Sequence, residues 1–168
     1  VDEIVEAWHT ERPDLDVEPL QVLSRLARLA DVLGERRANA FVEHGLQAHE
    51  FDVLSVLRRT GEPFELTAGE LAARTHVTSG TMTSRLDRLG GRGFVTRHPD
   101  PADGRLVRVR LTSDGRRHVD DAFAALLSSE RELLSVLDRE QHGALADALR
   151  TLLLTITRER RAADAPPR

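Results

Sequence analysis

Apolar residues recur at intervals of three and four along most of the chain, which is the spacing of one face of an α-helix. Prolines, glycines and capping residues divide this pattern into separate segments. The pattern predicts helices before residue 12, over about 19–45 and 47–60, directly after residues 67–70, and over about 79–91, 112–135 and 138–161. The chain is therefore expected to be mainly α-helical.

Two short helices in the middle of the chain are predicted from their capping residues. Thr67 and Glu70 have the spacing of a capping box, in which each side chain accepts a hydrogen bond from the other residue's backbone amide. Thr78 can cap the helix over 79–91. The apolar face of that helix consists of Met82, Leu86 and Leu89. Two short helices joined by a tight turn predict a helix-turn-helix unit.

A β-hairpin is predicted directly after this unit. Residues 94–98 resemble a strand, residues 99–104 are rich in proline, aspartate and glycine, and residues 106–111 nearly alternate apolar side chains with arginine. This alternation gives the hairpin one wet, basic face with Arg108 and Arg110. These arginines either contact phosphates or hold the hairpin against the domain.

Composition restricts the class of protein. A length of 168 residues suits one compact domain with a single core. The absence of cysteine excludes disulfides, thiol catalysis and thiolate metal sites. No apolar run approaches the roughly 18 residues of a membrane span, and no secretion signal opens the sequence. We therefore expect a soluble, cytoplasmic protein with no membrane partner.

Charge is unevenly distributed along the chain, whose net charge is -4. Residues 1–20 carry seven acids and one arginine, whereas residues 76–118 carry nine arginines and four acids, a net charge of +5. A basic segment inside an acidic protein is typical of an element that binds a polyanion. A charged face that serves only solubility is the alternative.

The basic segment contains the candidate DNA-binding residues. The polar side of the helix over 79–91 is rich in small hydroxyl side chains, which allow close approach to a duplex, and in arginines, which can bond guanine edges or phosphates. Arg105 lies at the predicted hairpin tip, where it can enter a minor groove and form a local ion pair with Asp103. The candidates are Ser79, Thr81, Thr83, Ser84, Arg85, Arg88 and Arg105.

These motifs, in this order, resemble the MarR family of winged-helix transcriptional regulators. The resemblance extends from about Pro19 to Arg161 and is strongest in residues 71–89, 92–95, 100–105 and 111–115. It implies a mainly α (α+β) fold, a winged helix-turn-helix domain with long N- and C-terminal dimerisation helices. It also implies a homodimer that binds a pseudopalindromic double-stranded operator, with half-sites roughly 34 to 36 Å apart.

The resemblance also assigns parts of the chain to roles. Residues 1–45 would form N-terminal helices for dimerisation and an effector wall, 46–113 the DNA-binding lobe, 114–161 the C-terminal dimerisation helices, and 162–168 a disordered tail. Within the family, segments around residues 6–8, 11–16, 43–46, 50–54 and 95–97 resemble the PecS and urate-responsive branch.

That branch implies release from DNA by a small anionic or aromatic effector, such as urate or a polycarboxylate resembling citrate or trans-aconitate. The matching residues imply Trp8 as a wall of the effector site, Arg97 as the contact to the anion, and Asp52 as a carboxylate that communicates with Arg97. The alternatives are that Trp8 only attaches its helix, that Asp52 and Arg97 form a structural pair, and that the regulator has no urate-like effector.

Other functions find less support in the sequence. The seven histidines lack the spacing of metal ligands, so neither a metal nor a cofactor is expected. The chain has no glycine-rich phosphate loop, nucleophile elbow or triad-like arrangement, which argues against an enzyme. A dimeric helical scaffold for protein partners remains an alternative, although it would not need the basic hairpin.

Overall fold

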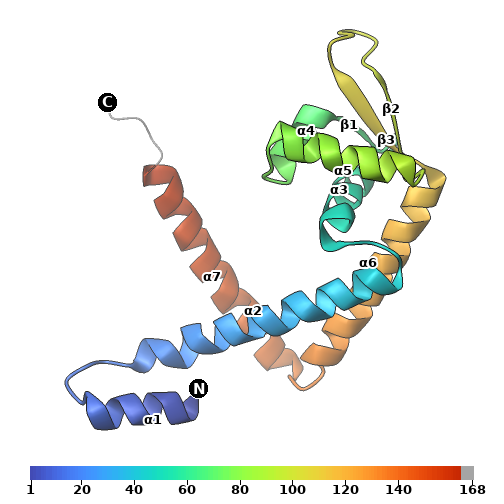
Figure 1. The fold of residues 1–168 in the computed structure, drawn as a ribbon. Coiled ribbons are helices and arrows are strands. Elements are labelled where there is room, and N and C mark those ends of the chain that lie inside the picture. The colour runs from blue at the N-terminus through green and yellow to red at the C-terminus, as the bar shows by residue number, and fades with distance from the viewer. Residues whose placement is uncertain (164–168) are drawn as a thin grey trace. The chain divides into compact units, whose positions relative to one another are not determined.

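The structure, a computed structural model, describes residues 1–163, with side chains to residue 159. It contains two compact units, Val1–Leu127 and the residues from Ser128 onward. The helices are α1 (Asp2–Glu11), α2 (Glu18–Glu43), α3 (Ala48–Arg59), α4 (Ala68–Arg74), α5 (Ser79–Gly91), α6 (Ser113–Leu134) and α7 (Arg139–Ala163). All the predicted helices are therefore present (Figure 1). α7 extends two residues into the predicted tail, and residues 164–168 of that tail lie outside the described residues.

The helix-turn-helix unit forms where the capping residues predict it. At the start of α4, Thr67 Oγ1 accepts from the Glu70 amide at 3.2 Å and Glu70 Oε2 accepts from the Thr67 amide at 2.8 Å. The Glu70 carboxylate accepts bonds from the Thr67 amide and also from the Thr67 hydroxyl, and these hold the pKa of Glu70 below its ordinary value because they favour the ionised form. At the start of α5, Thr78 Oγ1 accepts from the Thr81 amide at 3.3 Å. Both caps satisfy amides that have no partner within their own helix.

The sheet contains one strand more than the sequence pattern predicts. Its order is β1-β3-β2, with β1 (Glu65–Thr67), β2 (Val95–Pro99) and β3 (Val107–Leu111) paired antiparallel. The hairpin of β2 and β3, called the wing below, extends beyond the helices α4 and α5 (Figure 1). β1 comprises only three residues, too few to show an alternation of apolar and polar positions.

The sheet has one apolar and one charged face, because side chains alternate along each strand. The apolar face packs on α3 and α5 and carries Leu66, Val95, Val109 and Leu111, all buried. The opposite face carries Glu65, His98, Arg108 and Arg110, which the strand register aligns. The predicted basic face of the hairpin is therefore present, but a carboxylate lies within it.

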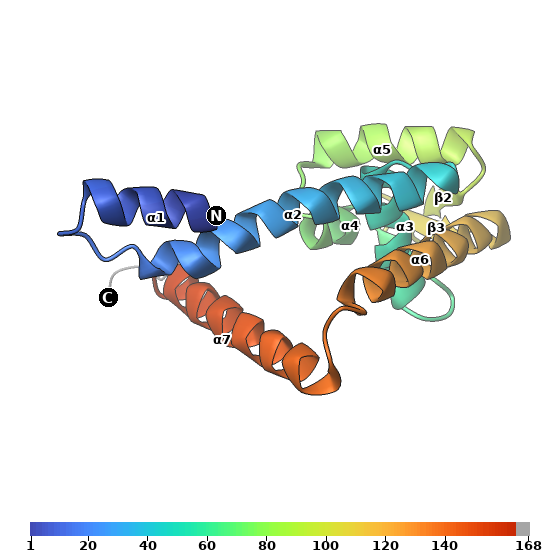
Figure 2. The same cartoon turned by 90° about the horizontal axis from the view of Figure 1, so that it is seen from below.

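The core of the first unit joins α3, α4, α5, the sheet and the first half of α6. Its most deeply buried side chains include Leu54, Leu57, Leu71, Met82, Leu86, Leu89 and Val109. α1 packs along the N-terminal part of α2 (Figure 2). Much of the apolar surface of α2 stays exposed, including Val22, Leu23, Leu26, Leu29 and Val32.

Candidate nucleic-acid interface

The polar side of α5 is largely exposed to solvent. Met82, Leu86 and Leu89 are buried and hold the helix on the core, as their spacing predicts. The predicted DNA-binding residues of this helix are exposed or half-buried on its other sides. They are Ser79, Thr81, Thr83, Ser84, Arg85 and Arg88. The helix therefore presents hydroxyls at its N-terminal end and guanidinium groups further along.

A groove of about 520 Å³ runs along this surface. It is lined by Gly80, Thr81, Ser84, Arg85 and Arg88 from α5 and by His49 from the start of α3. The His49 ring nitrogen Nε2 lies 3.4 Å from Arg88 Nη1. Sequence reasoning did not include His49 in this surface, because only the packing of α3 against α5 brings it there.

A buried ion pair fixes the C-terminal end of α5. Glu50, only 1% exposed, accepts from Arg92 Nη1 at 2.7 Å, and Arg92 Nη2 also donates to the Gly45 carbonyl at 2.5 Å. The Arg92 guanidinium lies over the Phe94 ring at 4.4 Å. These contacts link the ends of α2, α3 and α5. They fix the orientation of α5 on the domain.

Arg97 connects the wing to α5. Its Nη2 donates to Asp87 Oδ1 at 2.5 Å. The structural pair of Arg97 with Asp52, one of the alternatives from the sequence, is not formed: Arg97 pairs with Asp87 of α5, whereas Asp52 is exposed on α3. Sequence reasoning did not include Asp87 as a partner, because this contact depends on the packing of β2 against α5.

Arg105 is more exposed than Arg97, Arg108 and Arg110 of the wing, with 90% of its side chain accessible. Its Nε and Nη2 donate to the two carboxylate oxygens of Asp103, each at 3.0 Å, which confirms the predicted ion pair. The hydrogen bond to Arg105 lowers the pKa of Asp103. Asp100 stabilises the turn by accepting from the amides of Ala102 and Asp103, which lowers its own pKa. The tip therefore holds Arg105 in a defined but accessible position.

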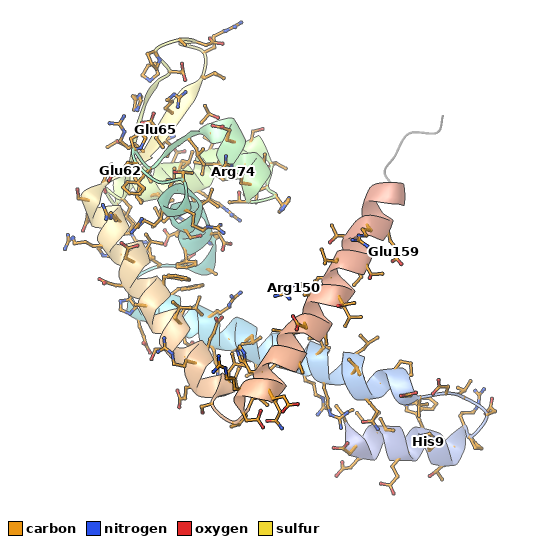
Figure 3. The ribbon with its side chains drawn as sticks, turned by 180° about the vertical axis from the view of Figure 1, so that it is seen from behind. His9, Glu62, Glu65, Arg74, Arg150 and Glu159 are labelled. Atoms are coloured by element: carbon orange, nitrogen blue, oxygen red, sulfur yellow. The ribbon has the colours of Figure 1, made fainter. Side chains whose placement is uncertain are left out.

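Glu65, labelled in Figure 3, lies at the base of the wing and contacts three basic side chains of the charged sheet face. Its Oε2 accepts from His98 Nε2 at 2.8 Å and from Arg110 Nε at 2.7 Å, and its Oε1 lies 3.5 Å from Arg108 Nη1. Burial opposes ionisation of this carboxyl, but the hydrogen bonds and charges of His98 and Arg110 outweigh it, so the pKa of Glu65 is lowered. Sequence reasoning missed Glu65 together with its strand.

Trp8 belongs to a different part of the fold from the other two predicted effector residues, Asp52 and Arg97. It is 48% exposed on α1, which packs against α2, whereas Asp52 belongs to α3 and Arg97 to β2. No contact among these three side chains occurs within the described chain. Within residues 1–163, no group of three His, Asp or Glu side chains is arranged to hold a metal ion. None of the described helices has the length and apolarity needed to cross a membrane.

The chain is similar to known proteins in sequence and in structure. A family model described as the MarR family matches residues 44–106. The HTH-type transcriptional regulator PecS of Dickeya dadantii (strain 3937) is 36% identical over 141 residues, which cover 84% of this chain and 85% of PecS.

Two solved structures of MarR from E. coli extend the comparison. The apo wild-type protein is 28% identical, with 76% of this chain and 96% of that chain covered and a TM-score of 0.62. A MarR mutant complexed with operator DNA is 26% identical, with 83% and 99% covered and the same TM-score of 0.62.

Proposed function

The chain belongs to the MarR family of transcriptional regulators, and we propose that it represses transcription by binding an operator through α5 and the wing. Its relatives are named as regulators, and the protein is accordingly not an enzyme. α5 would enter the major groove with its N-terminal hydroxyls and with Arg85 and Arg88. Arg105 would reach the adjacent minor groove.

The exposure of Arg105 beside the polar face of α5 is the observation that carries this proposal. Arg97, Arg108 and Arg110 are 33%, 35% and 50% exposed and each meets a carboxylate from another element or turn. Arg105 meets only the neighbouring Asp103 and is 90% exposed. A solvated guanidinium held by one local aspartate can exchange that partner for a phosphate or a base edge at little cost.

Replacing Arg105 with alanine is expected to weaken operator binding about tenfold and to reduce the salt dependence by about one unit of the log–log slope. The measurement is fluorescence anisotropy across a salt series, with a duplex that the wild-type protein selects from a randomised pool. Arg12→Ala is the matched control, because Arg12 forms the same fork two residues from Asp14 in a loop outside the proposed interface. Equal affinities of the two variants would contradict the role of Arg105. Failure of the wild-type protein to select a sequence would contradict the operator proposal and favour a protein-binding scaffold.

We also propose that two copies form the DNA-binding unit. α7 carries an apolar stripe of Leu145, Leu149, Leu152 and Ile156 and buries none of the residues described in it. α2 and α6 also expose large apolar side chains, among them Phe123 and Leu127 of α6. An apolar stripe of this length on a helix requires a partner. The proposed partner is a second copy of this chain, because a pseudopalindromic operator has two equivalent half-sites.

For the effector, we propose that an anion acts at Arg97 and shifts the wing relative to α5. The support is the 2.5 Å contact between Arg97 and Asp87, an ion pair that joins the wing to the exposed side of α5. An anion that competes with Asp87 for the guanidinium would loosen this link. Asp52 and Trp8 would enter such a site only with a contribution from the second copy or a movement of α1.

Urate and trans-aconitate are therefore expected to reduce operator binding in the wild-type protein and to do so at least tenfold less effectively in Arg97→Gln. Fluorescence of Trp8, which is the only tryptophan, reports whether the ligand also reaches α1. Anisotropy of the labelled duplex reports release. Equal release in the wild-type protein and in Arg97→Gln would contradict the anion contact, and release without a fluorescence change would exclude Trp8 from the site.

A further inference from the structure

One buried carboxylate, that of Glu65, meets three cationic or protonatable side chains of the wing. Two of them donate to it, His98 at 2.8 Å and Arg110 at 2.7 Å, and Arg108 lies 3.5 Å away. The side chain of Glu65 is 7% exposed, whereas those of its partners are 35% to 50% exposed. Glu65 belongs to β1, so it links the wing hairpin to a strand outside the hairpin.

We propose that Glu65 is a positioning residue that sets the sequence specificity of DNA binding. It holds the cations at the base of the wing on the sheet, so that Arg105 at the tip is the wing arginine offered to DNA. This inference rests on the proposed operator binding. It concerns how strongly the protein distinguishes its operator from other DNA.

A regulator binds DNA in two ways, non-specifically to any sequence and specifically to its operator. Contacts of arginine with phosphates strengthen binding to every sequence, because the phosphate backbone is the same everywhere. Specific binding also needs a wing of fixed position, so that its tip meets one groove in one register. A carboxylate at the base of the wing favours specific binding in two ways. It reduces the attraction of the wing arginines to the phosphates of any sequence, and it attaches the hairpin to β1.

A second carboxylate shows the same arrangement on the adjacent turn. Arg108 Nε donates to Asp100 Oδ2 at 2.5 Å, and the Asp100 side chain is 5% exposed. Arg108 therefore lies between two nearly buried carboxylates, Asp100 and Glu65. Glu65 is the more informative of the two to change, because Asp100 also accepts backbone hydrogen bonds in the turn and its loss would unfold the tip.

Glu65→Gln removes the charge with little change of shape, and Glu62→Gln is its matched control. Glu62 lies in the turn just before β1, is 79% exposed, and forms an ion pair with Arg116 at 3.7 Å (Figure 3). Both variants change the net charge by the same amount. Only Glu65→Gln leaves His98, Arg108 and Arg110 without their shared carboxylate.

The experiment measures the affinity of full-length wild-type protein and both variants for two duplexes of equal length. One duplex is the sequence selected by the wild-type protein, and the other is a shuffled sequence of the same composition. In Glu65→Gln we expect shuffled-duplex affinity to rise about threefold to tenfold. We also expect the salt slope to steepen by about 1 to 2 and the ratio of specific to non-specific affinity to fall about tenfold. In Glu62→Gln we expect all three quantities to stay near the wild-type values.

A positioning role differs from a merely structural one in these readouts. A fold that is only weakened would lose affinity for both duplexes in proportion to the unfolded fraction, which circular dichroism measures in the same samples. Glu65→Asp keeps the charge and is expected to recover most of the specificity ratio. Equal ratios in Glu65→Gln and Glu62→Gln, with operator selection by the wild-type protein intact, would overturn this inference alone. Absence of selection by the wild-type protein would overturn the proposed function.

Discussion

Replacing Gly115 with alanine is expected to lower the free energy of unfolding by about 3 kcal/mol, because the new methyl group has no space. A Cβ at this position would lie 2.2 Å from the Phe94 carbonyl oxygen and 2.9 Å from its carbon. Both are backbone atoms. They can move only if the start of α6 separates from the start of β2. Urea denaturation monitored by circular dichroism measures the decrease in the free energy of unfolding.

The contacts around Gly115 explain why this separation is costly. The Gly115 amide donates to Thr112 Oγ1 at 3.0 Å, and Thr112 in turn donates its hydroxyl to the Gly93 carbonyl at 2.7 Å and its amide to the Phe94 carbonyl at 3.0 Å. A shift of α6 would break bonds that close the turn between α5 and the wing. Gly93 makes this turn with a φ of 72°, a conformation that suits glycine.

Gly143→Ala is the matched control for this substitution. Gly143 lies in α7, and a Cβ there would meet nothing within 4 Å. Alanine in the interior of a helix is more stable than glycine by about 0.5 to 1 kcal/mol, so this variant should be slightly stabilised. A loss of less than about 1 kcal/mol in Gly115→Ala would show that α6 can move away from Phe94 without breaking the turn.

Local signals made the helices of this fold predictable from the sequence. The cap of α4 depends on Thr67 and Glu70, and that of α5 depends on Thr78, in each case within three residues of the amide that it satisfies. Interactions of this range leave a pattern that a single sequence displays. The Arg105–Asp103 fork was predictable for the same reason, since two residues separate its members.

Long-range charge pairs were not predictable, because no local pattern specifies them. Glu65 and Arg110 are 45 residues apart, and Arg92 and Glu50 are 42 residues apart. Which carboxylate meets which arginine follows from the register of β1 on β3 and from the packing of α3 on α5. The same limit applies to Arg97, for which sequence reasoning named Asp52 and not Asp87, its partner in the structure.

The charge pairs also change the interpretation of the basic segment. From the sequence, nine arginines between residues 76 and 118 suggest a broadly cationic surface. In the structure, Arg92, Arg97, Arg108 and Arg110 all meet carboxylates of other elements or turns. The proposed interface is therefore narrower than the sequence suggests. It consists of the polar face of α5 and the tip of the wing.

Replacing Leu152 with glutamate is expected to convert the protein to a monomer and to weaken operator binding about 100-fold or more. The proposed dimer stripe of α7 contains Leu145, Leu149, Leu152 and Ile156, which follow one another at helical spacing. A glutamate at its centre would place a charge in the interface. Each protomer would then bind one half-site alone. The increase in affinity that comes from binding two linked half-sites at once would be lost. Sedimentation equilibrium measures the mass, and anisotropy with the selected duplex measures the affinity.

Leu154→Glu is the matched control, because Leu154 lies on the other side of α7 among Asp147, Arg150 and Arg158. Both leucines are exposed within the chain, at 41% for Leu152 and 51% for Leu154, so neither substitution places a charge in the core of the protomer. We expect Leu154→Glu to remain dimeric with wild-type affinity. A dimeric Leu152→Glu variant would exclude this stripe as the interface. A monomeric variant with full operator affinity would show that one protomer suffices for binding, because Leu152 lies outside α5 and the wing.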